Sequence, residues 1–183
     1  MDLLTKEEVE RKKKLLITKI KRGSIFIHPT DTVYGIGCSA INEEAVKKIR
    51  EIKKSQIPFS IIIPGKKWIY ENCIITQQTE EWIKKLPGPY TLILKLKNKN
   101  AISKEVNMNL NTIGIRYPNH WIKDFVETFG QPIVSTIIMD ENQTILTHPE
   151  ELHHEISPKV DFAIHDGRLI RKRSEIITFS KLA

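Results

Sequence analysis

Helical and extended segments alternate along the chain, and this alternation limits the fold more strongly than any other feature. The clearest helix spans residues 119–129, where four apolar residues recur at i, i+3, i+4 and i+7 and Gly130 follows as a stop. Apolar runs of strand length separate such helices. The pattern predicts an α/β fold, in which helices pack on a sheet.

The other expected elements follow from capping and periodicity. Helices are predicted from a capping box at Thr5–Glu8 to Gly23, from the cap Asn42 along the face of Ala45, Ile49 and Ile52, from Thr79 to Leu86, and from a capping box at Thr147–Glu150 to about Ile156. Strands are predicted at residues 24–28, 59–63, 92–96, 112–116, 133–137, 160–164 and 176–179.

Composition indicates a single domain over residues 1–183, which we expect in the cytoplasm. The chain is long enough for one sizeable core, and no repeat or long Pro/Gly/Ser linker divides it. No apolar run is long enough to cross a bilayer, and the charged start lacks the apolar core of a signal peptide. Two cysteines, Cys38 and Cys73, make neither a disulfide framework nor a zinc quartet.

The net charge of +7 allows two interpretations. The excess lies at the ends: residues 1–22 hold eight Lys/Arg against four Asp/Glu, and residues 168–183 hold five against one. Such an excess attracts anionic ligands, including nucleotides and RNA. It also describes an ordinary solvated surface, so charge alone leaves both interpretations open.

The common nucleotide and metal fingerprints are absent from the sequence. Gly35-Ile36-Gly37 has Ala40 where a dinucleotide loop has its third glycine, and there is no Walker loop. No HExxH helix occurs, and the spacing of His148, His153 and His154 does not bring them onto one helix face. We therefore expect no protein-bound metal, and neither cysteine has a spacing typical of a nucleophile.

Three local features each allow a functional and a structural interpretation. The loop at residues 29–32 carries two threonines and an aspartate, which suit a ligand site or a turn that satisfies its own backbone. Lys53 closes a helix, where it either complements the helix dipole or binds a phosphate. Arg116 continues an apolar strand and needs an anion, supplied by a ligand or by a salt bridge.

Taken together and in this order, several short segments resemble the threonylcarbamoyl-AMP synthase (YrdC/YciO) family. They are PTDTVYGIGC at 29–38, a helix ending in IKK at 52–54, PGPYTLIL at 87–94, TIGIRYP at 112–118, GQPIVST at 130–136 and VDFAIHDG at 160–167. The resemblance covers about residues 15–179. Thr136–Met139 and Val160–Gly167 look more like the YciO branch than the YrdC branch.

The resemblance implies a fold and a reaction. The fold is a single domain with a twisted, mostly mixed or parallel sheet, flanking helices and a concave basic face. Active members join L-threonine, bicarbonate and ATP into threonylcarbamoyl-AMP and pyrophosphate, with Mg²⁺ on the ATP. A partner enzyme then modifies tRNA. Such a site needs positioning and positive charge rather than a covalent nucleophile.

The resemblance also implies roles for particular residues. Substrate binding falls to Thr32, Arg116 and Ser174, and nucleotide binding falls to Lys53, Lys54, Ser135 and Thr136.

Three departures from the family pattern keep an alternative open. Active relatives carry Lys-x-Arg where this chain has Lys53-Lys54-Ser55, and Ser-x-Asn where it has Ile137-Ile138-Met139. A late Ser-Thr pair is Ser174-Glu175 here. The alternative is a catalytically degraded, YciO-like paralog that binds nucleotide, tRNA or double-stranded RNA.

Overall fold

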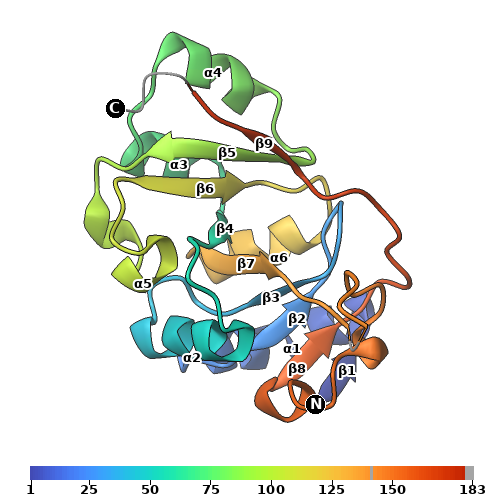
Figure 1. Ribbon diagram of the computed structural model, residues 1–183. Coiled ribbons are helices and arrows are strands. Elements are labelled where there is room, and N and C mark those ends of the chain that lie inside the picture. Colours follow the sequence, from blue (N-terminus) through green and yellow to red (C-terminus); the bar gives the residue numbers. More distant parts are fainter. Residues whose placement is uncertain (141, 180–183) are drawn as a thin grey trace.

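The computed structural model describes residues 1–140 and 142–179, so residues 180–183 of the predicted domain lie outside the described part. Within that part, nine strands join into one sheet (Figure 1). In chain order they are β1 (Asp2–Leu4), β2 (Phe26–His28), β3 (Gly35–Gly37), β4 (Ser60–Ile62), β5 (Tyr90–Lys95), β6 (Thr112–Arg116), β7 (Ile133–Ile137), β8 (Phe162–Ile164) and β9 (Glu175–Ile177).

The sheet is mixed, with the strand order β1-β8-β2-β3-β7-β4-β6-β5-β9. Four neighbouring pairs are parallel, namely β1–β8, β8–β2, β4–β6 and β5–β9, and the other four are antiparallel. The end of the chain therefore visits both halves of the sheet, because β8 pairs with β1 and β2 whereas β9 pairs with β5.

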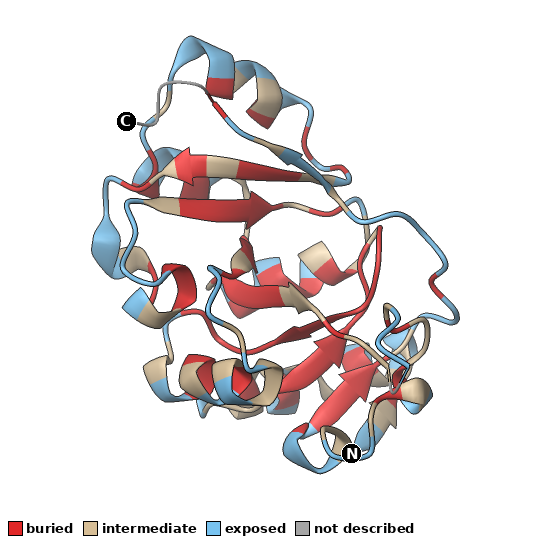
Figure 2. Ribbon diagram, in the orientation of Figure 1, coloured by how far each residue is buried: buried red, intermediate tan, exposed pale blue. Residues whose placement is uncertain are grey.

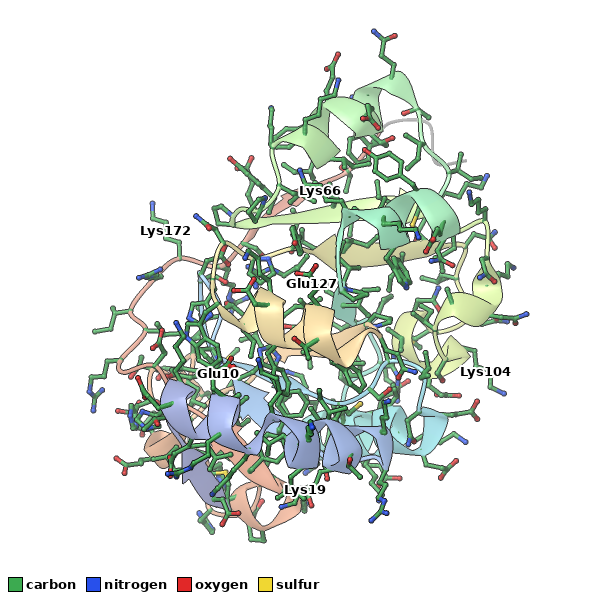
Figure 3. All side chains as sticks on the ribbon, turned by 180° about the vertical axis from the view of Figure 1, so that it is seen from behind. Glu10, Lys19, Lys66, Lys104, Glu127 and Lys172 are labelled. Carbon is green, nitrogen blue, oxygen red and sulfur yellow. The ribbon has the colours of Figure 1, made fainter. Side chains whose placement is uncertain are left out.

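Helices cover both faces of this sheet. The α-helices are α1 (Lys6–Lys21), α2 (Glu43–Lys53), α3 (Lys66–Asn72), α4 (Gln77–Lys84), α5 (Lys104–Asn107) and α6 (Ile122–Phe129). α1 and α6 lie in front in the view from behind (Figure 3), whereas α2 lies in front of the sheet in the opposite view (Figure 1). Among the described residues, no helix has both the length and the apolar character needed to cross a membrane.

A first apolar cluster joins α1 and α6 to the sheet. α1 buries Val9, Leu16 and Ile20, which share one face as the periodicity predicts. On the sheet, the rings of Phe26 and Phe162 stack with their centroids 5.1 Å apart. Burial at this interface accounts for the attachment of both helices.

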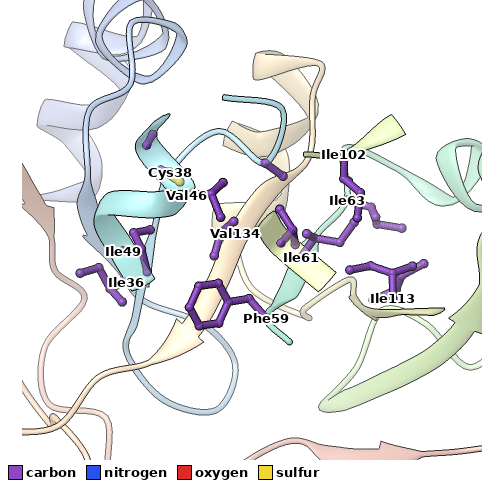
Figure 4. Packing of buried hydrophobic residues seen from close by; sticks show 14 of the residues in the cluster. Ile36, Cys38, Val46, Ile49, Phe59, Ile61, Ile63, Ile102, Ile113 and Val134 are labelled. Atoms are coloured by element: carbon purple, nitrogen blue, oxygen red, sulfur yellow. The ribbon is translucent and has the colours of Figure 1, made fainter. Parts of the chain in front are cut away.

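A second, larger cluster lies on the side of α2. Figure 4 shows Val46 and Ile49 of α2 beside Ile36, Val134 and Phe59. Buried residues are concentrated in the central strands, and exposed residues are concentrated in the loops and on the outer helix faces (Figure 2). Packing of these buried central strands therefore holds the ends of the strands in fixed positions relative to one another.

Most of the predicted caps are confirmed. Thr5 Oγ1 accepts the Glu8 amide proton at 3.3 Å, and the Glu8 carboxylate accepts the Thr5 amide proton at 2.9 Å. Asn42 caps α2 by accepting the Ala45 amide proton at 3.0 Å. Gly130 ends α6 in the left-handed region, with φ 77°.

Three helix predictions require correction. The helix predicted over residues 119–129 begins only at Ile122, after the cap position Trp121. α4 begins at Gln77 rather than at Thr79, because Thr76 is its cap and Thr79 completes the capping box from inside the helix. The helix predicted from Thr147 to Ile156 is wrong. The chain forms only short 3₁₀ turns there, η2 (Pro149–Glu151) and η3 (Ser157–Lys159). Leu152 instead makes an antiparallel bridge with Asp140, which holds its backbone extended.

Two of the described strands and two of the described α-helices have no counterpart among the predictions: β1, β3, α3 and α5. Each is short, and a segment of three to seven residues carries too little periodicity to be recognised. β3 contains two glycines and becomes a strand because β2 and β7 pair with it on its two sides. β3 therefore forms because of its pairing with distant strands and not because of a local sequence preference.

Candidate functional site

The loop between β2 and β3 is held by its own polar groups. Thr30 Oγ1 accepts the amide protons of Thr32 and Val33, at 3.1 and 3.2 Å, and donates to the Val33 carbonyl at 2.7 Å. The hydroxyls of Thr30 and Thr32 are 3.0 Å apart, and both residues are buried. The loop is therefore a turn that satisfies its own backbone, as the structural interpretation predicts. The same hydrogen bonds hold Thr32 in place, and Thr32 lines a cleft.

Arg116, the last residue of β6, has an anion within the chain. Its Nη2 donates to Asp31 Oδ1 at 2.6 Å, and both side chains are only 7% exposed. Burial lowers the pKa of the Arg116 guanidinium, and the Asp31 charge opposes that effect. The salt-bridge interpretation is correct. Arg116 nevertheless lines the cleft, and its buried Nε has no hydrogen-bond partner among the described residues.

The cleft itself has a volume of about 350 Å³ and lies at the ends of several strands. Its three cations are Lys53, Arg116 and Arg173, and none of the described residues that line it is Asp or Glu. A cleft of this size with this excess of positive charge suits a small anionic ligand. The wider concave basic face predicted from the sequence remains a prediction.

Lys53 is positioned by the end of α2. Its neighbour Lys54 adopts the left-handed region, φ 48°, and ends the helix there. The Lys53 ammonium donates to the Ile137 carbonyl at the end of β7. Burial lowers the pKa of Lys53, and the positive charge of Arg173 adds to that effect. A bound anion would oppose both effects on the pKa of Lys53. It would pair with the buried ammonium, and it would offset the repulsion between Lys53 and Arg173.

Residues 165–174 form a strap that connects β8 to β9 (Figure 1), and the last two of them, Arg173 and Ser174, line the cleft. Tyr34 holds the start of the strap, since its hydroxyl donates to the Gly167 carbonyl at 2.6 Å. Arg171 donates to the Asp31 carbonyl at 3.2 Å. At the other end of the strap, the hydroxyls of Ser174 and Thr91 are 2.7 Å apart. These bonds place Ser174 and Arg173 at the cleft.

The structure brings most of the predicted site residues together. The cleft is lined by six of the seven, namely Thr32, Lys53, Arg116, Ser135, Thr136 and Ser174. Lys54 lines a neighbouring hollow instead, because its left-handed backbone turns it away at the end of α2. The roles assigned to these residues remain predictions.

One of the three departures from the family pattern, at the Ser-x-Asn position, lies in the same cleft. Ile137 and Met139 both line it, where the resemblance leads one to expect a serine and an asparagine. They join Ile57, Pro58 and Ile176 in an apolar part of the lining. Ile57 and Ile176 are 68% and 66% exposed, so this apolar part opens to solvent.

Other cleft residues were not recognised from the sequence. Ser60 and Thr91 are polar residues within apolar strands, and that break in the pattern was the available signal. Tyr34 carried no comparable signal. The basic run at residues 171–173 made Arg171 and Arg173 candidates to replace the missing positive charge, and only Arg173 lines the cleft. The place of Arg173 at the cleft depends on the path of the strap.

The cleft suits an anion better than a bare cation. No group of His, Cys, Asp and Glu that could hold a metal ion occurs among the described residues. The carboxylate of Asp31, the chain neighbour of Thr32, accepts hydrogen bonds from Arg116 and from the Asn119 amide, the latter at 2.8 Å. Mg²⁺ commonly binds through substrate phosphates. The residues present therefore fit Mg²⁺ only as a companion of a phosphate ligand.

An open mixed sheet with a cationic cleft at its strand ends defines a class of α/β domains that bind small anionic substrates. The chain belongs to the Sua5/YciO/YrdC family: the family model described as "Telomere recombination" matches residues 18–182. Curated relatives of this chain include proteins named threonylcarbamoyl-AMP synthase, which is an enzyme.

Individual relatives illustrate the likeness. A Methanocaldococcus jannaschii protein, provisionally named threonylcarbamoyl-AMP synthase, is 35% identical over 88% of this chain and 77% of its own length. Escherichia coli YciO is 27% identical over 86% of this chain and 79% of its own length. The crystal structure of P. abyssi Sua5 complexed with L-threonine superposes with a TM-score of 0.85 at 25% identity. That alignment covers 99% of this chain and 54% of the Sua5 chain, so the chain spans about half of that protein.

Proposed function

We propose that this chain is a threonylcarbamoyl-AMP synthase that uses L-threonine, bicarbonate and ATP, and that its product serves tRNA threonylcarbamoyladenosine modification. The observation that carries the proposal is the cationic cleft, in which Thr32, Lys53, Arg116 and Ser174 meet from four distant segments. The likeness to a Sua5 complexed with L-threonine supports threonine as one substrate.

The proposed reaction has two steps. The threonine amine attacks bicarbonate and forms N-carboxy-threonine with loss of water. A carboxylate oxygen of that carbamate then attacks the α-phosphorus of ATP, and pyrophosphate leaves. Both steps gather negative charge in one place, and fixed cations stabilise such charge more strongly in a cleft than in water.

The residues of the cleft would divide this work by charge and by hydrogen bonding. Arg116 would bind a carboxylate or carbamate through Nε, which has no hydrogen-bond partner among the described residues, while Nη2 stays bonded to Asp31. Lys53 and Arg173 would face the phosphates. Mg²⁺ would arrive with ATP and neutralise phosphate charge there.

A second candidate is a paralog that binds nucleotide without turnover. It is favoured by Ile137 and Met139, which line the cleft without offering side-chain hydrogen bonds. Each lost bond is worth about 0.5–1.5 kcal/mol, or about 1.5–3 kcal/mol to a charged group. Two such losses would weaken ATP binding by about tenfold to a thousandfold.

Two measurements separate the two candidates. The protein is incubated with L-threonine, bicarbonate and labelled ATP, and pyrophosphate and threonylcarbamoyl-AMP are measured. Calorimetry then compares ATP affinity in the native chain and in the Ile137→Ser, Met139→Asn variant. Product formation with micromolar ATP affinity and no gain in the variant supports the synthase. No product, with a gain in the variant, supports the degraded paralog.

A further inference from the structure

Thr91 contacts two different neighbours with the two branches of its side chain. It lies in β5, which runs between β6 and β9 (Figure 1), and it is only 4% exposed. Its methyl group lies beside Gly114 of β6, since a Cβ built on that glycine would be 3.3 Å from Thr91 Cγ2. Its hydroxyl lies 2.7 Å from the hydroxyl of Ser174. Because a β-branched side chain has few χ1 rotamers, packing of the methyl group also fixes the direction of the hydroxyl.

Backbone pairing holds Ser174 beside Thr91. Ser174 directly precedes β9, and the Glu175 amide donates to the Pro89 carbonyl at 2.9 Å. β9 then pairs in parallel with β5, with Glu175 opposite Tyr90. The contact between the two hydroxyls therefore depends on the pairing of two strands, and both Thr91 and Ser174 line the cleft.

The burial of Thr91 decides which of the two hydroxyls donates. Each hydroxyl has one proton to donate and can also accept. Among the described residues, the side chain of Thr91 has a hydrogen bond to Ser174 and to no other group. If Ser174 donated, the proton of Thr91 would be buried without an acceptor, which is the costly arrangement. Thr91 therefore donates, and the proton of Ser174 remains for another acceptor.

We infer that Thr91 is a positioning residue for Ser174: it donates to Ser174 Oγ, and Ser174 donates its own proton to an oxyanion bound in the cleft. A hydroxyl that accepts one hydrogen bond becomes a stronger donor in the next, because the two bonds polarise each other. The three cations of the cleft, and the lack of Asp and Glu in its described lining, favour an oxyanion as the acceptor.

This inference deepens the proposed function and rests on it for the identity of the ligand. In the proposed reaction the oxyanion is the carboxylate of L-threonine or a phosphate of ATP, and the two share the chemistry that Ser174 would recognise. Arg173 directly precedes Ser174 and also lines the cleft, so one short segment supplies both a positive charge and a hydroxyl donor.

The first test needs no ligand. A buried hydroxyl proton that is held in a hydrogen bond exchanges slowly with water, so proton NMR should show a protected resonance for the Thr91 hydroxyl. Its loss in Thr91→Val assigns the resonance, and we expect it to move in Ser174→Ala. A protected Ser174 hydroxyl in its place, no protected resonance, or a resonance unmoved by Ser174→Ala overturns the inference.

The second test separates the two branches of the Thr91 side chain. Thr91→Val keeps both branches and removes the hydroxyl, whereas Thr91→Ser keeps the hydroxyl and removes the methyl group. Calorimetry measures the affinity of each variant for L-threonine and for inorganic pyrophosphate. The ligand that Ser174 contacts should bind about threefold to tenfold more weakly to Thr91→Val, and with nearly native affinity to Thr91→Ser. Equal losses in the two variants, or a loss confined to Thr91→Ser, indicate a packing role and overturn the inference.

A double variant and the choice of ligand complete the design. Ser174→Ala should weaken the same ligand about tenfold to a hundredfold, and Thr91→Val should add nothing in that background. A loss for L-threonine alone assigns Ser174 to the amino acid, and a loss for pyrophosphate alone assigns it to the phosphates. Additive losses, no loss with either ligand, or no native affinity for either ligand overturn the inference. If pyrophosphate responds as expected but the native chain binds no L-threonine, the role of Thr91 stands and the proposed function fails.

Discussion

Acid should destabilise this protein through His28, and the effect can be sized from the structure. The folded chain holds the pKa of His28 at about 4, against an ordinary value of 6.5, chiefly because the ring is fully buried. Between those values the unfolded chain binds a proton that the folded chain does not, so stability falls as the pH falls. The contribution is complete above pH 6.5 and is lost as the pH drops through that window to about 4.

The gap of about 2.5 between the two pKa values (6.5 − 4) corresponds to about 3 kcal/mol, at about 1.4 kcal/mol for each pKa unit. From pH 7 to pH 5 about 2 kcal/mol of this is lost, because at pH 5 the unfolded imidazole is mostly protonated and the folded one is not. With a urea slope of about 2 kcal/mol per molar, the midpoint moves by about 1 M.

Urea unfolding at pH 7 and pH 5 checks this, with His28→Phe as the comparison. The variant keeps every other titrating group, including His120, so the difference between the two proteins isolates His28. The native chain should lose about 2 kcal/mol more than the variant over this pH range. Equal losses in the two proteins would show that the imidazole is not held neutral by its burial, and the reasoning would be refuted.

Three further perturbations test the energetics of the site and the fold. Asp31→Asn should cost about 3–5 kcal/mol in a urea titration, because it leaves the buried Arg116 without its counter-charge, and a cost below about 1 kcal/mol would contradict a desolvated pair. Gly37→Ala should cost about 1–3 kcal/mol or prevent folding, since the new Cβ would lie 2.4 Å from the Val134 carbonyl oxygen, and a neutral result would refute that close contact. Nucleotide or RNA affinity should fall steadily with salt in a filter-binding titration, because the ligand would be held mainly by charge, and a flat salt dependence would exclude that mode.

Local chemistry explains why many elements were predictable from the sequence. The caps at Thr5 and Asn42 and the stop at Gly130 act over three or four residues, so neighbouring residues decide them. The helix predicted after Thr147 failed for the opposite reason: the bridge between Leu152 and Asp140 is a tertiary pairing that overrides a local capping signal.

The sequence by itself also indicated the family and most of the candidate site, because Thr32, Lys53 and Arg116 lie in motifs whose order is specific. Taken singly, the loop of Thr32, the helix end at Lys53 and the strand end at Arg116 each also had a structural interpretation. For Arg116 both interpretations hold at once, and no local pattern could show that Asp31 would be its partner.

The tertiary structure alone decided which late residues line the cleft and which residue is buried against β3. The strap of residues 165–174 reaches the cleft because β8 and β9 pair with distant strands, and this path brings Arg173 beside Lys53. The buried ring of His28 fits against β3 because antiparallel pairing brings Gly35 and Gly37, which have no Cβ, beside it. Contacts of this kind depend on strand register across many residues, and register is fixed only when the whole core packs.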